Sequence, residues 1–278
     1  MDFQRIFVID LVSLGVGAAK DADKYDSIGA DTLGHVMDQS EEGFSLPELT
    51  SFGLGNIRRD SPVNQLAPVE NPKAYFGKLG MQSHSNGFNV GLREMFDYNT
   101  NVRTTSLMDD VPTLSKGKCK TIIISNYQNY LANQLHTENI SVGDDADVFR
   151  ELHRIAVKPQ DGLIYVRISG LHRRAKRGDT KGYRQVLSGV DGEIHRLAGE
   201  LFESDLLIVT SSYANDPALK HRFTREYLPL LVYFNGISVG QSLGNRNSTA
   251  DIGATIADVF GITLGQGSIG KSFLSELQ

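Results

Sequence analysis

Apolar, β-branched runs recur along the chain and are separated by stretches with a helical pattern. Residues 6–12 (IFVIDLV) lead into a turn of small residues, and similar runs lie at 121–125, 162–168, 205–210 and 230–234. Runs of this kind are typical of buried strands. Residues 146–156, 181–201 and 249–260 instead carry apolar side chains at helical spacing. Strands that alternate with helices predict a three-layer α/β/α sandwich around a mostly parallel sheet.

Residues 60–118 break this alternation. They are rich in Asn, Ser, Gly and Pro and hold few periodic apolar positions, so we expect long loops over the sheet. In open α/β sheets, such loops gather at the carboxyl ends of the strands, where binding sites usually lie. No repeat, low-complexity segment or clear linker divides the sequence, which favours a single domain over residues 1–278.

Composition and charge narrow the class of protein. The 278 residues are 40% hydrophobic and 22% charged with a net charge of −5, which excludes a disordered or collagen-like chain and a disulfide scaffold. The mild negative charge argues against nucleic-acid binding. The apolar runs are far shorter than the about 20 residues that a membrane-spanning helix needs, so we expect no membrane partner. Asp10 interrupts the first apolar run, which argues against a signal peptide, and the single cysteine, Cys119, fits a cytoplasmic location.

One phosphate-binding pattern occurs near the end of the sequence. Residues 265–272 (GQGSIGKS) match GxxxxGK[ST], in which backbone amides surround phosphates and the lysine reaches the outer ones. Such a loop must join a buried strand to a helix, but the residues before this one have the pattern of a helix end. We therefore expect a glycine-rich surface loop. The seven histidines show no HxxxH or HExxH spacing, so zinc sites of that type are not indicated.

Several longer strings point to a family. They are 15–22 (GVGAAKDA) with 29–35 (GADTLGH), 46–57 (LPELTSFGLGNI), 224–233 (TREYLPLLVY), and 250–257 (ADIGATIA) with 270–274 (GKSFL). Together, and in this order, they resemble the phosphopentomutase family of the alkaline phosphatase (metalloenzyme) superfamily. The resemblance implies an alkaline-phosphatase-like core and an enzyme that moves phosphate between C1 and C5 of ribose or deoxyribose with two Mn²⁺ ions.

The positions at which this resemblance implies metal ligands hold other residue types. Aligned on the family's motifs, they are Val12, Ser169, Lys176, Ser212, Tyr213 and Phe223, and the nucleophile region has Phe88 and Val90 where the family has threonines. Carboxylates and neutral imidazoles bind such metals, whereas a lysine or a phenylalanine does not. We therefore expect no metal cofactor and no catalytic residue of the family's kind.

The resemblance also implies a cap domain, which the family inserts after the nucleophile region. Only about 25 residues separate Met95 from the strand that begins at Thr121. We expect this cap, which would be inserted near residues 95–120, to be absent.

These expectations favour a phosphopentomutase-like pseudoenzyme that binds, regulates or scaffolds, with a protein or a small phosphorylated ligand as its partner. Anion or partner contacts are predicted at Arg173, Arg174, Arg177, Arg222, Thr224 and Arg225, although a solvated face would also explain the basic run at 172–177. The alternative is an active metal-dependent isomerase or phosphotransferase with a rebuilt site. Its available donors are Asp10, Asp31, His35, Asp216 and His221. A purely structural subunit is the third possibility.

Overall fold

Strands and helices alternate along most of the chain in the computed structural model, which describes residues 2–38, 44–63, 65–96, 119–126, 137–219, 223–265 and 267–277. The strands are β1 (Arg5–Asp10), β2 (Tyr75–Leu79), β3 (Thr121–Ser125), β4 (Thr137–Ser141), β5 (Gly162–Arg167), β6 (Asp205–Thr210), β7 (Leu228–Tyr233) and β8 (Ser242–Arg246). The helices are α1 (Thr32–Asp38), α2 (Pro47–Ser51), α3 (Phe88–Met95), α6 (Asp145–Ala156), α7 (Gly170–Ala175), α8 (Thr180–Glu200) and α9 (Ala250–Val259). Short 3₁₀ turns are η1 (Ala22–Tyr25), η2 (Asn56–Arg58), η3 (Pro217–Leu219) and η4 (Leu274–Glu276).

The described strands form one eight-stranded sheet in the order β4-β3-β5-β1-β6-β7-β2-β8. The strands from β4 to β6 in this order pair in parallel, and β8 pairs in parallel with β2. β7 runs antiparallel to both of its neighbours. The mostly parallel sheet that the sequence predicts is thereby confirmed, with one antiparallel strand inside it.

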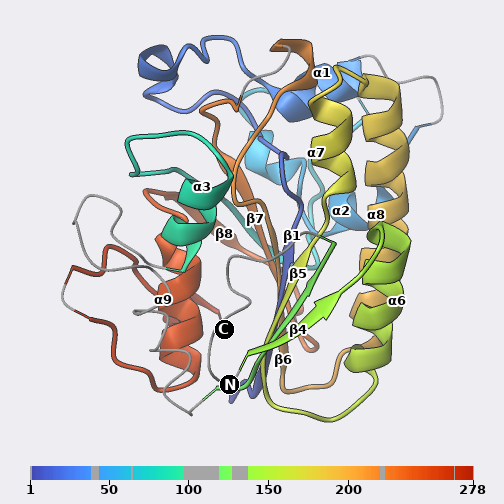
Figure 1. The fold of residues 1–278 in the computed structure, drawn as a ribbon, viewed down its shortest axis with the longest axis vertical. Helices are drawn as coiled ribbons and strands as arrows, with labels where there is room; N and C mark the ends of the chain where they lie inside the picture. The colour runs from blue at the N-terminus through green and yellow to red at the C-terminus, as the bar shows by residue number, and fades with distance from the viewer. Residues whose placement is uncertain are drawn as a thin grey trace.

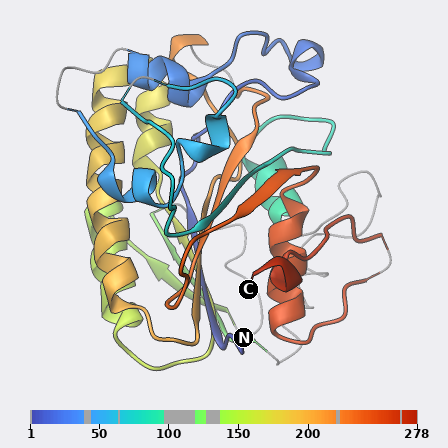
Figure 2. The same cartoon turned by 180° about the vertical axis from the view of Figure 1, so that it is seen from behind.

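Helices cover both faces of this sheet (Figures 1 and 2). α1, α2, α6, α7 and α8 lie over one face, and α3 and α9 lie over the other. Alternate side chains of β1 enter the two cores, with Phe7 and Ile9 in the first and Ile6 and Val8 in the second. The chain is therefore the predicted three-layer α/β/α sandwich.

The two longest helices begin at aspartates that cap them. The Asp144 side chain accepts a hydrogen bond from the Asp147 amide at the start of α6, and Asp179 accepts one from the Gly182 amide at the start of α8. Such caps satisfy amide donors that have no partner within a helix. They explain why these helices begin within one residue of the positions that the periodicity predicts.

The expectation that residues 60–118 form loops over the sheet is wrong for part of that range. The range contains β2, which lies between β7 and β8 within the sheet, and α3, which covers one face. β2 is only five residues long and includes Gly77 and Lys78, so it shows no clear apolar pattern. The Lys78 ammonium lies over the Tyr227 ring at 4.7 Å, which explains how a lysine is accommodated there. Residues 97–118 lie outside the described part of the chain.

The segment with the phosphate-loop pattern follows α9 and contacts that helix. The Lys271 amide donates to Asp251 and the Ser272 hydroxyl donates to Asp258. A Cβ on Gly270 would lie 2.3 Å from the Ala250 carbonyl oxygen, so glycine is required for this close approach. The strand that a phosphate loop needs does not precede it in the described chain. These residues fasten the C-terminal segment to α9.

A buried ion pair joins the amino ends of two central strands. Arg5 and Asp205 are each 1% exposed and form two hydrogen bonds, of 2.8 and 2.5 Å. The same guanidinium donates to the carbonyl oxygens of Ala156 (2.9 Å) and Lys158 (2.6 Å), where α6 ends. Arg5 therefore neutralises Asp205 and also satisfies carbonyls that the end of the helix leaves without partners.

We predict that Asp205→Asn lowers the free energy of unfolding by about 3 kcal/mol, because it leaves the buried Arg5 charge without its counter-ion. Urea denaturation of the purified variant measures this loss. The control is Glu138→Gln, which removes a half-exposed carboxylate 3.3 Å from Lys120 and should change the stability by less than about 0.5 kcal/mol. Equal losses in the two variants would contradict the prediction.

Candidate functional site

The carboxyl ends of the three central strands meet at one edge of the sheet. Asp10 of β1 is level with Arg167 of β5 on one side and with Thr210 of β6 on the other. The loops that follow these strands therefore start side by side. This is the edge at which sites form in α/β sheets.

Three aromatic rings pack together beyond this edge. His172 lies 5.4 Å from Tyr213 and 5.9 Å from Phe223, and the Tyr213 and Phe223 ring centroids are 5.2 Å apart. Tyr213 meets both other rings edge to face, a favourable arrangement for aromatic pairs. We call these three residues the aromatic cluster. Two of its members, Tyr213 and Phe223, stand at positions where the resemblance implies metal ligands.

The other positions of the implied metal centre border this cluster. The Ser13 amide, next to Val12, donates to the Tyr213 carbonyl oxygen, and Ser212 directly precedes Tyr213. Ser169 is the residue before α7, the helix that carries His172. The fold therefore brings the turn after β1 to the loop after β6, and the rings of Tyr213 and Phe223 in that region pack against His172 of α7.

Positive charges surround the imidazole of the aromatic cluster. Burial, together with the charges of Arg167, Lys176 and Arg173, lowers the pKa of His172 to about 4. The ring is therefore neutral at physiological pH. Its Nδ1 atom is buried and has no hydrogen-bond partner among the described residues.

The helix from the nucleophile region packs directly against this site. A Cβ on Gly91 of α3 would lie 1.7 Å from the Ser212 carbonyl oxygen, and one on Gly87 would lie 3.6 Å from the Phe223 ring. Glycine at position 91 permits the first of these close contacts, whereas at position 87 the φ of 132° favours glycine. Phe88 and Val90, the two positions predicted for the nucleophile region, thus belong to a helix that packs against the loop after β6.

These residues do not fit a pair of Mn²⁺ ions. The implied ligand positions offer hydroxyl groups, apolar side chains and the Lys176 ammonium, which do not match the carboxylate and imidazole ligands that Mn²⁺ takes. In the part of the chain that the structure describes, no group of three or more His, Cys, Asp or Glu side chains is arranged to hold a metal ion.

The candidate ligands for a rebuilt metal site lie in two separate parts of the structure. Asp216, fully buried, accepts a hydrogen bond from the Asp31 amide (2.8 Å), and His35 Nδ1 lies 2.6 Å from the same carboxylate. The Asp31 carboxylate instead forms an ion pair with Arg58. His221 lies outside the described residues.

Asp10 holds the loop that follows β6. Its buried carboxylate accepts hydrogen bonds from the Tyr165 hydroxyl (2.5 Å) and from the Ser212 amide (2.8 Å). Burial raises the pKa of Asp10, and these hydrogen bonds oppose the rise. This carboxyl group therefore fixes the backbone next to the aromatic cluster.

A buried glutamate joins the turn after β1 to the segment that precedes β7. Glu226 Oε2 accepts hydrogen bonds from the amides of Thr32 (2.9 Å) and Gly17 (3.3 Å), and Oε1 accepts them from the hydroxyls of Thr32 (2.7 Å) and Thr224 (2.6 Å). Burial, reinforced by the nearby Asp216 carboxylate, raises the pKa of Glu226 to about 7 against these hydrogen bonds.

The residues predicted to bind an anion do not all reach one surface. Arg225 is 1% exposed and donates to Asp21 and to the carbonyl oxygens of Ser83 and Met81. Thr224 is buried against Glu226. The side chains of Arg225 and Thr224 are thus hydrogen-bonded to other residues of the protein, and Arg222 lies outside the described residues.

The remaining predicted contacts lie on α7 and the turn after it. Arg173 is half exposed, donates to the Ser169 hydroxyl (2.6 Å) and lies 3.5 Å from the Asp145 carboxylate, and Arg174 pairs with Asp179 (2.8 Å). Arg177 is exposed. Arg173 and Lys176 lie close enough to His172 to lower its pKa, and with Arg174 and Arg177 of the same helix and turn we call them the cationic surface.

The sequence patterns do not single out two residues of the site. His172 belongs to the basic run at 172–177, and it also stands one helical turn after Ser169, an implied ligand position. Glu226 lies inside the string TREYLPLLVY, but the sequence gives no sign that its carboxyl group is buried. Its position as an acidic residue inside a string shared with the family is the signal that could have pointed to it.

Comparison with known proteins identifies the family. A model described as the metalloenzyme superfamily matches residues 4–264. The chain belongs to the metalloenzyme superfamily. It is also similar to curated phosphopentomutases: that of Alkaliphilus metalliredigens is 25% identical over 393 residues, with 98% of each chain covered. That of Clostridium perfringens is 25% identical over 400 residues, with 99% of each chain covered.

This metalloenzyme-superfamily chain is shorter than those relatives. The first alignment runs over 393 residues whereas the chain has 278, a difference of 115. A difference of that many residues corresponds to the size of a small domain. Deletion of the cap near residues 95–120 stays a prediction, because most of that range lies outside the described residues.

Solved structures support the same fold. A protein from Pyrococcus horikoshii matches with a TM-score of 0.62 at 9% identity, over 96% of this chain and 100% of that one. An alkaline phosphatase superfamily protein from Vibrio parahaemolyticus matches with a TM-score of 0.57 at 12% identity, over 98% of this chain and 70% of that one. Among the described residues, none of the helices has both the length and the apolar character needed to cross a membrane.

Glu226 makes the stability of the chain depend on pH. The folded-state pKa of about 7 lies above the usual value of 4.5, so the folded protein holds a proton that the unfolded chain releases between these values. We predict that stability falls by about 3 kcal/mol as the pH rises from 4.5 through 7, owing to this group.

The variant Glu226→Gln, which has the shape of the protonated side chain, should lack this contribution. Urea denaturation across the same pH range measures the difference between wild type and variant, and Glu138→Gln serves as the exposed control. A difference that stays constant with pH would show that the buried carboxyl group does not titrate in this range.

Proposed function

We propose that this chain is a phosphopentomutase-like pseudoenzyme, which acts through binding, as a regulator or scaffold, rather than through phosphate transfer. One observation supports the proposal: two of the positions at which the resemblance implies metal ligands hold Tyr213 and Phe223, and these pack as rings against His172. We further propose that the protein acts in the cytoplasm, which rests on its composition.

The cationic surface beside the aromatic cluster supports a role in binding. Arg173 and Arg177 are exposed there, and Lys176 and Arg167 are close enough to His172 to affect its pKa. Guanidinium groups form charge-assisted hydrogen bonds with phosphates and carboxylates. We propose that this surface binds a small phosphorylated ligand or an acidic segment of a partner protein.

The metal half of this proposal is tested by loading the purified protein with Mn²⁺, desalting it and measuring bound metal by mass spectrometry. We expect less than about a tenth of an equivalent, because the ligand positions offer no suitable donor set. We also expect no conversion of ribose 1-phosphate to ribose 5-phosphate in the presence of Mn²⁺.

The phosphopentomutase of Clostridium perfringens, treated in the same way, provides the positive control for both assays. Stoichiometric Mn²⁺ in this chain, or turnover that disappears with a chelator, would overturn the pseudoenzyme proposal.

The proposed binding of a phosphorylated ligand is tested by calorimetric titration of the metal-free protein with ribose 5-phosphate at low salt. We predict that Arg173→Ala with Arg177→Ala weakens binding by about tenfold or more, through loss of charge-assisted contacts. The matched control is Arg150→Ala with Arg154→Ala, which removes the same charge from exposed positions of α6. Equal weakening in both double variants would indicate only a general charge effect and would contradict a site on α7.

A further inference from the structure

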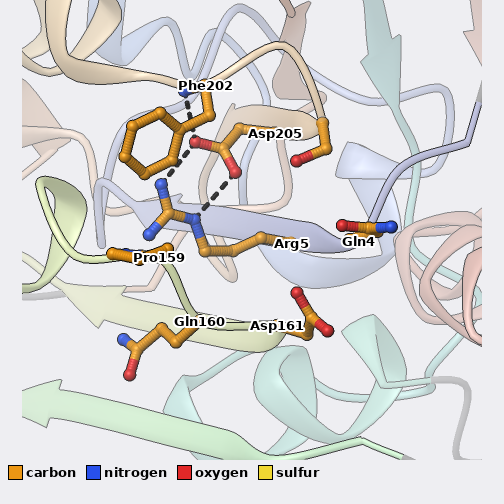
Figure 3. A pocket seen from close by; sticks show the side chains of 8 residues that line it. Gln4, Arg5, Pro159, Gln160, Asp161, Phe202 and Asp205 are labelled. Carbon is orange, nitrogen blue, oxygen red and sulfur yellow. Dashed lines mark hydrogen bonds and ion pairs between the residues drawn. The ribbon is translucent and has the colours of Figure 1, made fainter.

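A cavity of about 370 Å³ lies at the amino ends of β1, β5 and β6, at the edge of the sheet opposite the aromatic cluster (Figure 3). Its volume is in the range of small-molecule pockets. Backbone hydrogen bonds fix its walls, because the Gln4 amide donates to the Ser204 carbonyl oxygen (3.0 Å) and the Gly162 amide donates to the Gln4 carbonyl oxygen (2.9 Å). The cavity is therefore preformed by the strand pairing itself.

The floor of the cavity is electrically neutral. Arg5 and Asp205 form the buried ion pair described above, and the remaining guanidinium donors are engaged by the carbonyl oxygens at the end of α6. The Phe202 amide donates to the same Asp205 carboxylate (2.7 Å). With both charges matched and hydrogen-bonded, the floor offers no ionic attraction to a charged ligand.

The rim carries short polar side chains. Gln4, Gln160, Asp161 and Ser204 line it, and together they offer amide donors, carbonyl and carboxylate acceptors and a hydroxyl. Gln160 Nε2 is buried and makes no hydrogen bond to the described chain. Asp161 is exposed and forms no ion pair with a described residue, so its negative charge disfavours anions.

An aromatic side chain forms one wall. Phe202 is 41% exposed, an unusual degree for a phenylalanine, and its ring lies 5.0 Å from the Arg5 guanidinium. Figure 3 shows Phe202 and Asp161 on opposite sides of Arg5. The Phe202 ring and the polar side chains of the rim nevertheless line the same cavity.

We propose that this cavity binds a neutral polyhydroxy compound, that is, a mono- or disaccharide. Hydroxyl groups both donate and accept hydrogen bonds, which matches a rim that offers both an acceptor at Asp161 and donors at Gln4 and Gln160. The C–H face of a sugar ring can pack on Phe202. The site is separate from the cationic surface on α7 and does not depend on the proposed function.

The test is NMR titration of the ¹⁵N-labelled protein with D-glucose, D-galactose, D-ribose and myo-inositol. We expect at least one of them to shift amide signals of the segments before β1, β5 and β6 with a millimolar Kd. Phe202→Ala should weaken binding by about tenfold, and Asp161→Asn, at an exposed position, should weaken it without affecting the fold. Val239→Ala, at a residue with the same 41% exposure, is the control and should leave binding unchanged.

The proposal is overturned if none of these compounds shifts those signals, or if Phe202→Ala and Asp161→Asn both bind as the wild type does. Tighter binding of glucose 6-phosphate than of glucose at these same signals would also overturn it, because the proposed site is neutral at its floor and acidic at its rim.

Discussion

The buried carboxyl group of Glu226 is the contact on which the site depends. It receives four hydrogen bonds from the turn after β1, from α1 and from Thr224, and so it fastens the segment before β7 to the start of the first loop. A Cβ on Gly15 would lie 2.2 Å from this carboxylate, which leaves room only for glycine there. Because Phe223 directly precedes Thr224, the same attachment places Phe223 against Tyr213.

This attachment involves none of the positions at which the resemblance implies metal ligands. The loops after β1, β5 and β6 are positioned by backbone and buried polar contacts, such as that of Asp10 with the Ser212 amide. None of these contacts requires a metal-binding side chain at the centre. The rings of Tyr213 and Phe223 pack against each other beside these loops. The backbone positions of the loops therefore do not depend on the chemical type of the side chains at positions 213 and 223.

The carboxyl and amino ends of the central strands differ in how their charged side chains are paired. At the carboxyl edge, Lys176 and Arg173 lie close enough to His172 for their positive charges to lower its pKa. At the amino edge, Arg5 and Asp205 neutralise each other inside the protein. The two edges therefore differ in the charge that they carry, although both are built on the same three strands.

The sequence by itself determined the layered fold and most of its central strands, because β-branched runs and helical periodicity report burial directly. It could not reveal β2, whose five residues are held by strand pairing on both sides and not by a local pattern. The family strings predicted which positions belong to the site, since they preserve order along the chain. Only the tertiary structure decided what those positions form: it stacked His172 on Phe223 and buried Arg225 and Glu226. Burial and packing arise from residues far apart in sequence, so no local pattern carries them.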